Sequence, residues 1–168
     1  MLISDYYREQ NRQLHKDLAG YGSKHRAHRF SRAREIAENV GASSILDYGC
    51  GKGISGEVLG ARLYDPAIEL LAELPDPADL VICWDVLEHI EPYYLDSVLS
   101  HIQSLAVKAL YLVIATRPDS SKLLPDGRNP HLIVQPAEWW IDKIGAYWDT
   151  FTFDIIPKPG EVEIIWKC

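Results

Sequence analysis

The sequence predicts a three-layer α/β/α fold with a mainly parallel sheet that ends in an antiparallel hairpin. Two continuous apolar runs, Leu80–Trp84 and Leu110–Ala115, have the character of parallel strands buried on both faces. Segments with helical spacing separate such runs, so strands and helices alternate along the chain. Near the end, two β-rich segments flank Pro157–Gly160, a pattern typical of a hairpin. This order of elements predicts one sheet with helices on both faces.

The predicted elements divide the chain into an N-terminal helical lid, residues 1–40, and a sheet-based core, residues 41–168, of a single domain. In the lid, Arg29–Val40 has helical periodicity. The core is expected to contain, in order, strand Ser44–Tyr48, helix Ser55–Leu59, strand Ala61–Tyr64, short helix or turn Ala67–Leu74, strand Leu80–Trp84, helix Tyr94–Ala106, strand Leu110–Ala115, helix Pro136–Ala146, and hairpin strands Thr150–Ile156 and Glu161–Trp166. The polar stretch Thr116–Pro130 is long for a loop in a compact domain, which indicates a functional or mobile segment.

Length and composition are those of one globular domain. The chain has 168 residues, of which 47% are apolar and 24% charged. No apolar run approaches the roughly 20 residues that cross a bilayer, and Met1–Asp5 lacks the features of a signal peptide. We therefore expect a cytoplasmic protein with no membrane partner. Cys50, Cys83 and Cys168 lie far apart and form no CxxC pair, so neither a disulfide framework nor a zinc cluster is indicated.

The charge of the chain disfavours a nucleic-acid partner. The formal net charge is -7, whereas binding to nucleic acid depends on Lys and Arg neutralising phosphates. One basic run goes against this trend and contains Lys24, His25, Arg26, His28, Arg29, Arg32 and Arg34. Two interpretations remain open for this run, a solvated helix face and an anion-binding lid.

A glycine-rich loop follows the first predicted strand. Glycines alternate at Gly49, Gly51 and Gly53, where the missing side chains let the backbone turn sharply and approach a ligand. The ends of parallel strands are the usual place for ligands in such a sheet. The loop is therefore interpreted as a cofactor cradle, and the alternative is a tight turn that needs glycine only for its geometry.

Asp47 distinguishes between two cofactors that such a loop could hold. An acidic side chain two residues before the first glycine would repel the pyrophosphate of a dinucleotide. S-adenosylmethionine brings an ammonium and a sulfonium group, which an anion attracts directly or through water, while loop backbone groups would take its carboxylate. Gly51–Gly56 also satisfies the GxGxxG spacing, but it starts too late after the strand. The loop is thus expected to bind S-adenosylmethionine through Asp47, Gly49, Cys50, Gly51 and Gly53.

Two further acidic residues end predicted strands. Asp65 follows the second strand, where a carboxylate can accept hydrogen bonds from both hydroxyls of a ribose. Its alternative role is to cap an Asp-Pro turn. Asp85 ends the strand Leu80–Trp84 and should face the same edge of the sheet, a position compatible with capping the next helix. Both are candidate cofactor-binding residues.

The segments Ile45–Gly53 and Asp79–Ile90 resemble the first motif and the central-strand motif of the class I S-adenosylmethionine-dependent methyltransferase superfamily. The resemblance covers about residues 44–166. It implies a Rossmann-like fold and methyl transfer as the activity, and it does not name the acceptor.

The sequence departs from that superfamily between Asp65 and Asp79. The superfamily fits a full helix and a third strand there, whereas only about one short element fits in this chain. We therefore expect a sheet that is pruned after its second strand. The adenine end of the cofactor must then be covered by other groups, for which the candidates are Trp84, Ile90 and the region of Tyr6, Tyr7 and Tyr21.

Methyl transfer is a direct displacement, so the protein mainly has to align the acceptor and exclude water. If the acceptor needs a base, the candidates are His131 and His89. Arg128 and Asn129 are candidates for gripping an acidic or polar acceptor. A metal site of Asp85, Glu88, His89 and His131 is conceivable, but an Asp-x-x-Glu-His sequence at this place is common in metal-independent members, so no metal is expected.

The predicted function is S-adenosylmethionine-dependent methylation, on oxygen or nitrogen, of a small polar acceptor. Three alternatives remain. The first is a catalytically inactive module that binds the cofactor, an alternative that the pruned sheet and the short length of the chain suggest. The other two are a nicotinamide oxidoreductase, which Asp47 disfavours, and a nucleic-acid methyltransferase, which the acidic charge disfavours.

Overall fold

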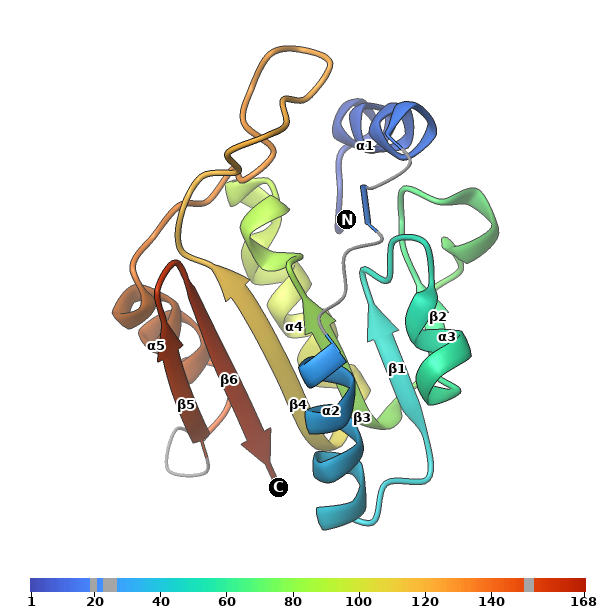
Figure 1. The fold of residues 1–168 in the computed structure, drawn as a ribbon, viewed down its shortest axis with the longest axis vertical. Coiled ribbons are helices and arrows are strands. Elements are labelled where there is room, and N and C mark those ends of the chain that lie inside the picture. Colours follow the sequence, from blue (N-terminus) through green and yellow to red (C-terminus); the bar gives the residue numbers. More distant parts are fainter. Residues whose placement is uncertain (19–20, 23–26, 150–152) are drawn as a thin grey trace.

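The computed structural model describes residues 1–18, 21–22, 27–149 and 153–168. Within them, six strands form one sheet in the order β2-β1-β3-β4-β6-β5. The strands are β1 (Ile45–Tyr48), β2 (Arg62–Tyr64), β3 (Ala78–Trp84), β4 (Ala106–Ala115), β5 (Phe153–Lys158) and β6 (Glu161–Lys167). β1 to β4 are parallel, whereas β6 is antiparallel to both β4 and β5. This is the predicted Rossmann-like sheet with a C-terminal hairpin (Figure 1).

Helices cover both faces of the sheet, which confirms the three-layer prediction. Described helices are α1 (Asp5–Asp17), α2 (Ala27–Asn39), α3 (Ile54–Leu59), α4 (Leu95–Leu105) and α5 (Ala137–Gly145), with short 3-10 turns η1 (Glu69–Leu71), η2 (Leu87–His89) and η3 (Pro92–Tyr94). Side chains alternate along each strand, so odd and even positions feed different layers. Val81 and Cys83 of β3 pack on the side of α4 and α5, while Leu80 and Ile82 pack on the side of α2.

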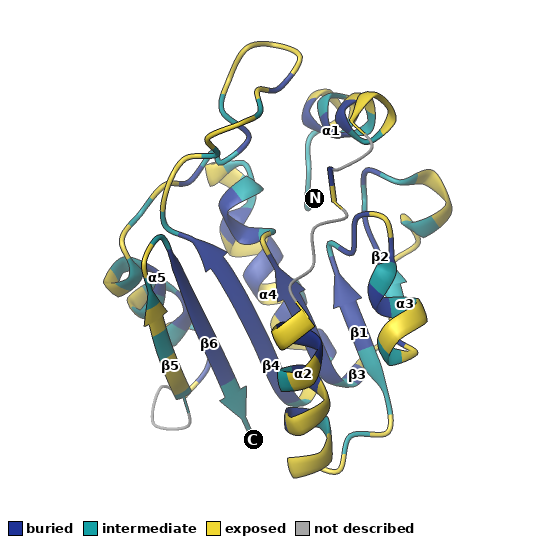
Figure 2. Cartoon of the chain, viewed as in Figure 1, coloured by how far each residue is buried: buried dark blue, intermediate teal, exposed yellow. Residues whose placement is uncertain are grey.

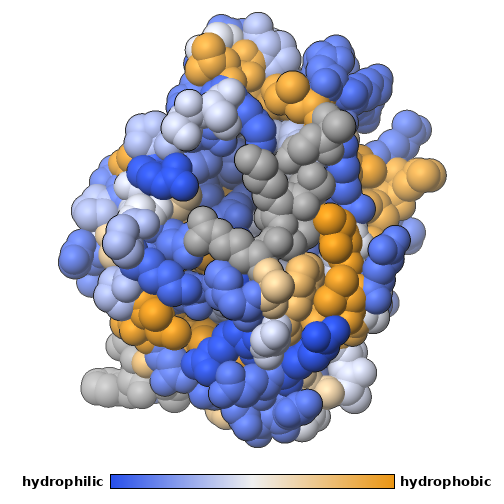
Figure 3. Space-filling model, in the orientation of Figure 1, coloured by the Kyte–Doolittle hydropathy of each residue, from blue (hydrophilic) through white to orange (hydrophobic). Residues whose placement is uncertain are grey.

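The inner strands are buried along most of their length, as Figure 2 shows, and the exceptions include the first residues of β4, where Val107 is exposed. On α2, Phe30, Ala33 and Ile36 recur at helical spacing and pack against the sheet. On the opposite face, Trp140 and Ile144 of α5 are fully buried. The face drawn in Figure 3 is mainly hydrophilic, with apolar residues in small groups. Among the described residues, no helix combines the length and the apolar character that a membrane span requires.

The sheet is pruned after β2, as the sequence predicts. Between Tyr64 and Ala78 the chain forms only the three-residue turn η1 and no strand, so β2 is an edge. α1 lies across the carboxyl ends of the parallel strands, away from either face of the sheet (Figure 1). The segment predicted as a helical lid thus contains two helices with different positions. α1 lies over the strand ends (Figure 1), whereas α2 packs on one face of the sheet.

Two local predictions differ appreciably from the structure. The helix predicted to reach Ala106 ends at Leu105, and β4 begins directly afterwards, four residues earlier than expected. Pro157, predicted in the hairpin turn, lies within β5, which is tolerated because β5 is an edge strand. The predicted beginning of that strand at Thr150 lies outside the described residues.

Candidate active site

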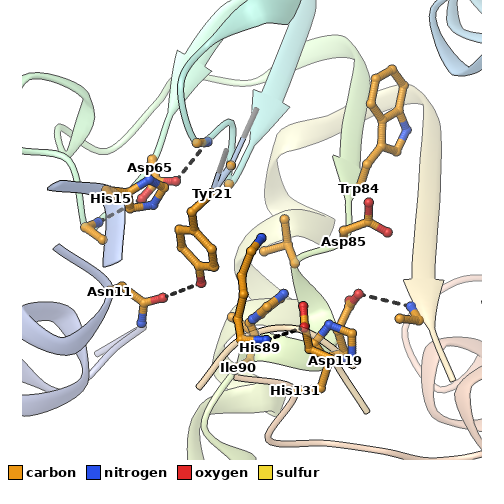
Figure 4. A pocket seen from close by; sticks show the side chains of 18 of the residues that line it. Asn11, His15, Tyr21, Asp65, Trp84, Asp85, His89, Ile90, Asp119 and His131 are labelled. Atoms are coloured by element: carbon orange, nitrogen blue, oxygen red, sulfur yellow. Dashed lines mark hydrogen bonds between the residues drawn. The ribbon is translucent and has the colours of Figure 1, made fainter. Parts of the chain in front are cut away.

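The carboxyl ends of β1 to β4 surround one cavity of about 480 Å³. Its walls come from these strand ends, from α1 and the segment after it, and from the loop that follows β4. The residues that line it include Tyr7, Asn11, His15, Tyr21, Cys50, Asp65, Trp84, Asp85, Glu88, His89, Asp119 and His131. Figure 4 shows that the labelled members converge from several elements on the same space. The structure therefore places a cavity at the edge of the sheet where the sequence predicted a site.

The glycine loop approaches its neighbours too closely for any side chain. A Cβ atom on Gly49 would lie 2.5 Å from Val86, and one on Gly51 would lie 2.6 Å from the carbonyl oxygen of Gly22. Both glycines also have positive φ angles, 79° and 53°. Gly51 must therefore be a glycine, because Gly22, in the segment after α1, packs directly against the loop at this position. Gly53 precedes α3 and does not line the cavity.

All five backbone N–H groups of the loop are engaged within the protein. Gly49 and Cys50 both donate to the Tyr64 carbonyl at the end of β2, at 2.7 and 3.0 Å. Gly51 donates to the Asp65 carboxylate at 3.0 Å. The remaining two bonds run from Lys52 to Gly22 and from Gly53 to Cys50, each at 3.0 Å. The loop therefore has no vacant N–H for a carboxylate, contrary to the expectation from sequence, and none for a pyrophosphate.

Asp47 is buried beneath this loop and does not line the cavity. Its carboxylate accepts a hydrogen bond from the hydroxyl of Ser55 on α3. Burial raises the pKa of Asp47 to about 7, and the Ser55 bond only partly offsets this. In this arrangement Asp47 ties the end of β1 to α3, and its predicted role toward a cofactor stays a prediction.

Asp65 lies in the cavity wall and is only 7% exposed. Its two carboxylate oxygens accept N–H groups from Gly51, at 3.0 Å, and from Ala67, at 2.9 Å. A carboxylate offers about four acceptor positions, so capacity remains for a ligand. His15 of α1 lies beside it (Figure 4), and burial raises the pKa of Asp65. Asp65 thus joins the glycine loop, the pruned edge and α1.

Asp85 faces the cavity from the end of β3 with an unusual backbone conformation. Its φ angle is 55°, in the left-handed region that favours glycine. Its carboxylate accepts hydrogen bonds from both terminal nitrogens of Arg29, at 2.6 and 3.3 Å, and Arg29 also pairs with Glu161 at 3.2 Å. Arg29 is 1% exposed. This member of the basic run is therefore a buried ionic bridge, whereas Lys24, His25 and Arg26 lie outside the described residues.

Trp84 and Cys50 are buried residues at the edge of the cavity. The Trp84 ring packs edge-on against Phe30, with centroids 5.6 Å apart, and against Tyr111, at 5.4 Å. Most of the indole is therefore part of the α2 side of the core. Both residues border the cavity, and their predicted contacts with a cofactor stay predictions.

His89 and His131 meet at the opposite end of the cavity. Their ring centroids are 4.7 Å apart and their planes are nearly perpendicular, although 42 positions separate them in the sequence. His131 Nδ1–H donates a hydrogen bond to the Arg117 carbonyl at 2.6 Å, so Nε2 is the nitrogen that carries the lone pair of the neutral ring. Burial, together with His131, lowers the pKa of His89 to about 4, so its imidazole is neutral at pH 7. The structure thus unites both predicted catalytic residues.

Arg128 and Asn129 do not line the cavity. The guanidinium of Arg128 is paired with Asp126 at 2.7 Å in the loop after β4. Asn129 instead organises this loop, because its side-chain oxygen accepts the N–H groups of both Asp119 and His131. Their predicted contacts with an acceptor find no support in this arrangement and stay predictions.

Asn11 and His15 of α1 line the cavity but were not singled out from the sequence, which named only Tyr6 and Tyr7 of this helix. Tyr7 and Asn11 lie one turn apart and face the cavity, and Asn11 accepts a hydrogen bond from the Tyr21 hydroxyl at 3.0 Å. The signal was present, because Tyr7, Asn11 and Leu14 are the buried positions of α1 and have helical spacing. Tyr7 and Tyr21 are among the candidates for the adenine end, whereas Tyr6 points outward and bonds to Asp126.

Several buried polar atoms of the cavity wall have no hydrogen-bond partner in the part of the chain that is described. They are His15 Nδ1, Glu88 Oε2 and His89 Nδ1. Burying such atoms without partners costs roughly 1–3 kcal/mol each. Their concentration around one cavity indicates that a polar ligand completes it.

The fold of this chain is similar to several solved methyltransferase structures. A complex of DhpI with S-adenosylhomocysteine matches with a TM-score of 0.60 and 17% identity, over 95% of this chain and 92% of that one. Magnesium protoporphyrin IX methyltransferase from Synechocystis PCC 6803 matches with a TM-score of 0.54 and 20% identity, over 96% and 100%. The methyltransferase domain of a bacterial Hen1 protein, CtHen1-CN, matches with a TM-score of 0.56 and 12% identity, over 83% and 97%.

At these identities, the likeness concerns the fold. No curated protein sequence matches the chain. The methyltransferase domain family matches residues 6–149, which include α1, the glycine loop, both histidines and α5. The chain therefore belongs to the methyltransferase domain family.

Proposed function

We propose that this protein transfers a methyl group from S-adenosylmethionine to a small polar acceptor. The observation that carries the proposal is the buried Asp65 carboxylate, which faces the cavity beside a glycine loop whose N–H groups are all engaged. A dinucleotide needs vacant N–H groups for its pyrophosphate, whereas the adenosine part of S-adenosylmethionine needs an acceptor for its ribose hydroxyls. The neighbours that were crystallised with S-adenosylmethionine or S-adenosylhomocysteine support the same cofactor.

The cofactor end of the cavity consists of the strand ends of β1 and β2 and of α1. The residues proposed to hold the cofactor are Gly49, Cys50, Gly51, Asp65, Trp84 and Asp85, with Tyr7, His15 and Tyr21 covering it from above. His15 Nδ1 is buried and lacks a partner among the described residues, so it is ready to bind a polar ligand. α1 acts in this proposal as a lid that replaces the element missing from the pruned edge.

The acceptor end consists of His89, His131 and the loop after β4. When bound, S-adenosylmethionine supplies a sulfonium methyl group, which passes to the acceptor while the carbon–sulfur bond breaks and its electron pair stays on sulfur. Both histidines offer ring nitrogens toward the space where the acceptor must lie (Figure 4). A ring nitrogen there can bind the acceptor hydroxyl or amine and take its proton. A cavity of about 480 Å³ suits small ligands, which supports a small acceptor.

Calorimetric titration with S-adenosylmethionine, S-adenosylhomocysteine and NAD tests the cofactor. We expect binding of the first two and none of NAD. In the variant Asp65→Asn, affinity for S-adenosylmethionine should fall at least tenfold, because an amide accepts fewer hydrogen bonds than a carboxylate. Asp76→Asn is the matched control, since Asp76 is exposed on the same pruned edge. Binding of NAD alone would overturn the proposal.

Transfer of a labelled methyl group into a cell extract tests the activity and identifies the acceptor. A labelled small molecule that disappears with Asp65→Asn is the expected result. Binding of S-adenosylmethionine without any labelled product would favour the alternative of an inactive binding module.

A further inference from the structure

Three potential ligands for a cation converge at the acceptor end of the cavity. Among the described residues, Glu88, His89 and His131 each offer one atom such that all three atoms lie within 4.8 Å of one another. A divalent ion bound at about 2.1 Å holds neighbouring ligand atoms roughly 3–4 Å apart. Small side-chain rotations therefore suffice to close the set around one ion.

Glu88 is held so that one carboxylate oxygen remains available. The residue is completely buried, and its Oε1 accepts the backbone N–H of Ala115 at 3.1 Å. Its own carbonyl accepts the N–H of Ile133, at 3.0 Å, which fixes the backbone. Oε2 is buried and has no partner in the described part of the chain. A carboxylate oxygen in this state calls for a cation or a donor from a ligand.

The two imidazoles are oriented in the same way. His131 donates from Nδ1 to the Arg117 carbonyl, so Nε2 is its available nitrogen. The Pro130 carbonyl accepts a hydrogen bond from the His89 ring, because a proline has no backbone N–H to donate. His89 Nδ1 has no partner among the described residues. Its proton is therefore on Nε2, and Nδ1 carries a lone pair. Second bonds to backbone carbonyls are the usual way in which proteins orient histidine ligands of metals.

We propose that Glu88 Oε2, His89 Nδ1 and His131 Nε2 bind one divalent transition-metal ion. Two imidazoles and one carboxylate are suited to Mn²⁺, Fe²⁺, Co²⁺ or Zn²⁺, whereas Mg²⁺ and Ca²⁺ prefer sites made of oxygen ligands. This proposal departs from the expectation from sequence that no metal binds, and it assigns three ligands to the cation. These ligands leave at least one coordination position open toward the cavity.

This inference deepens the proposed function, on which its catalytic part rests, and it names an oxygen acceptor. A hydroxyl group that binds the open position loses its proton to water at a lower pH than it does in solution. Its oxygen then supplies the electron pair that forms the bond to the methyl carbon, as the carbon–sulfur bond breaks. The two histidines act here as metal ligands that position the acceptor oxygen.

Metal binding can be measured without turnover. After treatment with a chelator, the full chain is titrated with Co²⁺ and with Mn²⁺, by visible absorption and by calorimetry, in the absence of S-adenosylmethionine. We expect one equivalent at micromolar or lower Kd. Glu88→Gln and His131→Ala should each weaken metal binding at least tenfold. Removing a group that only orients a ligand already lowers metal affinity by about that factor, and removing the ligand itself should cost at least as much. His28→Ala, which changes a half-exposed histidine beside Glu163, should bind as the wild type does.

Absence of stoichiometric binding, or binding that both ligand variants retain, overturns the metal site. His131 is only partly buried, so its truncation removes little core packing, and a melting curve of each metal-free variant verifies folding. S-adenosylmethionine titrated into the same samples separates the two proposals. Cofactor binding without metal binding refutes only the cation, and metal binding without cofactor binding refutes the proposed function.

Discussion

The two ends of the cavity are built in opposite ways. At the β1–β2 end, the loop from Gly49 to Gly53 has every N–H engaged, and Asp65 is tied to two of its neighbours. At the β3–β4 end, Glu88 and His89 carry buried atoms without partners among the described residues. The strand-end loop of the first end is therefore finished and presents a fixed shape and one carboxylate to a ligand, and the buried atom without a partner at this end, His15 Nδ1, comes from α1. The second is chemically incomplete, which is where reactivity is expected.

The largest effect should come from breaking the incomplete end. His89→Ala should lower the rate of methyl transfer by about 10²–10⁴-fold, the usual range for a group that handles the acceptor proton or positions the acceptor. Affinity for S-adenosylmethionine should change less than about threefold, because the two ends are separate. Single-turnover rates and calorimetry on the same sample measure both quantities. A large loss of cofactor affinity with an unchanged rate would contradict the division of the cavity.

The next effect is on the pH dependence of the protein's stability, and it comes from Asp47, which is buried beneath the glycine loop. Asp47 has a pKa of about 7 in the folded protein, against 3.8 for an aspartate exposed to water. Its contribution to stability is complete below about pH 4 and is lost as the pH rises through 7, to a total of about 4 kcal/mol at most. Urea unfolding at pH 4.5, 6 and 7.5 should therefore show a flatter profile for Asp47→Asn than for the wild type.

Asp76→Asn serves as the control in that experiment, because its exposed carboxylate should leave the profile of the wild type unchanged. Parallel profiles for wild type and Asp47→Asn would mean that the buried carboxylate has an ordinary pKa.

A smaller effect is expected from the contact between the glycine loop and the lid. Gly51→Ala should lower affinity for S-adenosylmethionine about tenfold, because the new Cβ pushes Gly22 and α1 away from the cavity. Gly41→Ala is a matched control, since Gly41 has a similar φ of 58° but nothing within 4 Å of a Cβ. Both variants carry the same backbone strain, so their difference in Kd isolates the lid. Equal losses would show that strain alone matters.

The smallest effects should sharpen the boundary of the acceptor end. Asn129→Ala removes the hydrogen bonds that hold Asp119 and the backbone of His131, so methyl transfer should fall about tenfold. Arg128→Ala should change it less than about twofold, because that side chain pairs with Asp126 outside the cavity. Initial rates over a range of acceptor concentrations test this. A strong rise of the KM for the acceptor in Arg128→Ala would indicate that Arg128 binds the acceptor.

What the sequence could predict differs between the two ends for a physical reason. The glycine loop, Asp65 and the pruned edge depend on neighbours in the chain, and local patterns predict each of them. The pairing of His89 with His131 depends on tertiary structure, yet both can be named because they follow strand ends. The role of Arg29 could not be predicted, since a basic run on a polar helix gives no sign that one member is buried between Asp85 and Glu161. A lid with Tyr7 could be proposed from the sequence, but Asn11 of the same helix could not, because its buried stripe is short.

The Arg29 bridge also has a consequence for the order in which the chain can fold. Arg29 lies on α2, and Glu161 belongs to β6, which is synthesised after the other five strands and lies between β4 and β5 in the sheet. Until β6 is made, one edge of β4 stays unpaired, and Arg29 can pair with Asp85 but not with Glu161. The residues of β6 therefore complete the sheet and the ionic bridge in one event. A ribosome-bound chain that lacks them would hold an exposed β4 edge, which is a known starting point for aggregation.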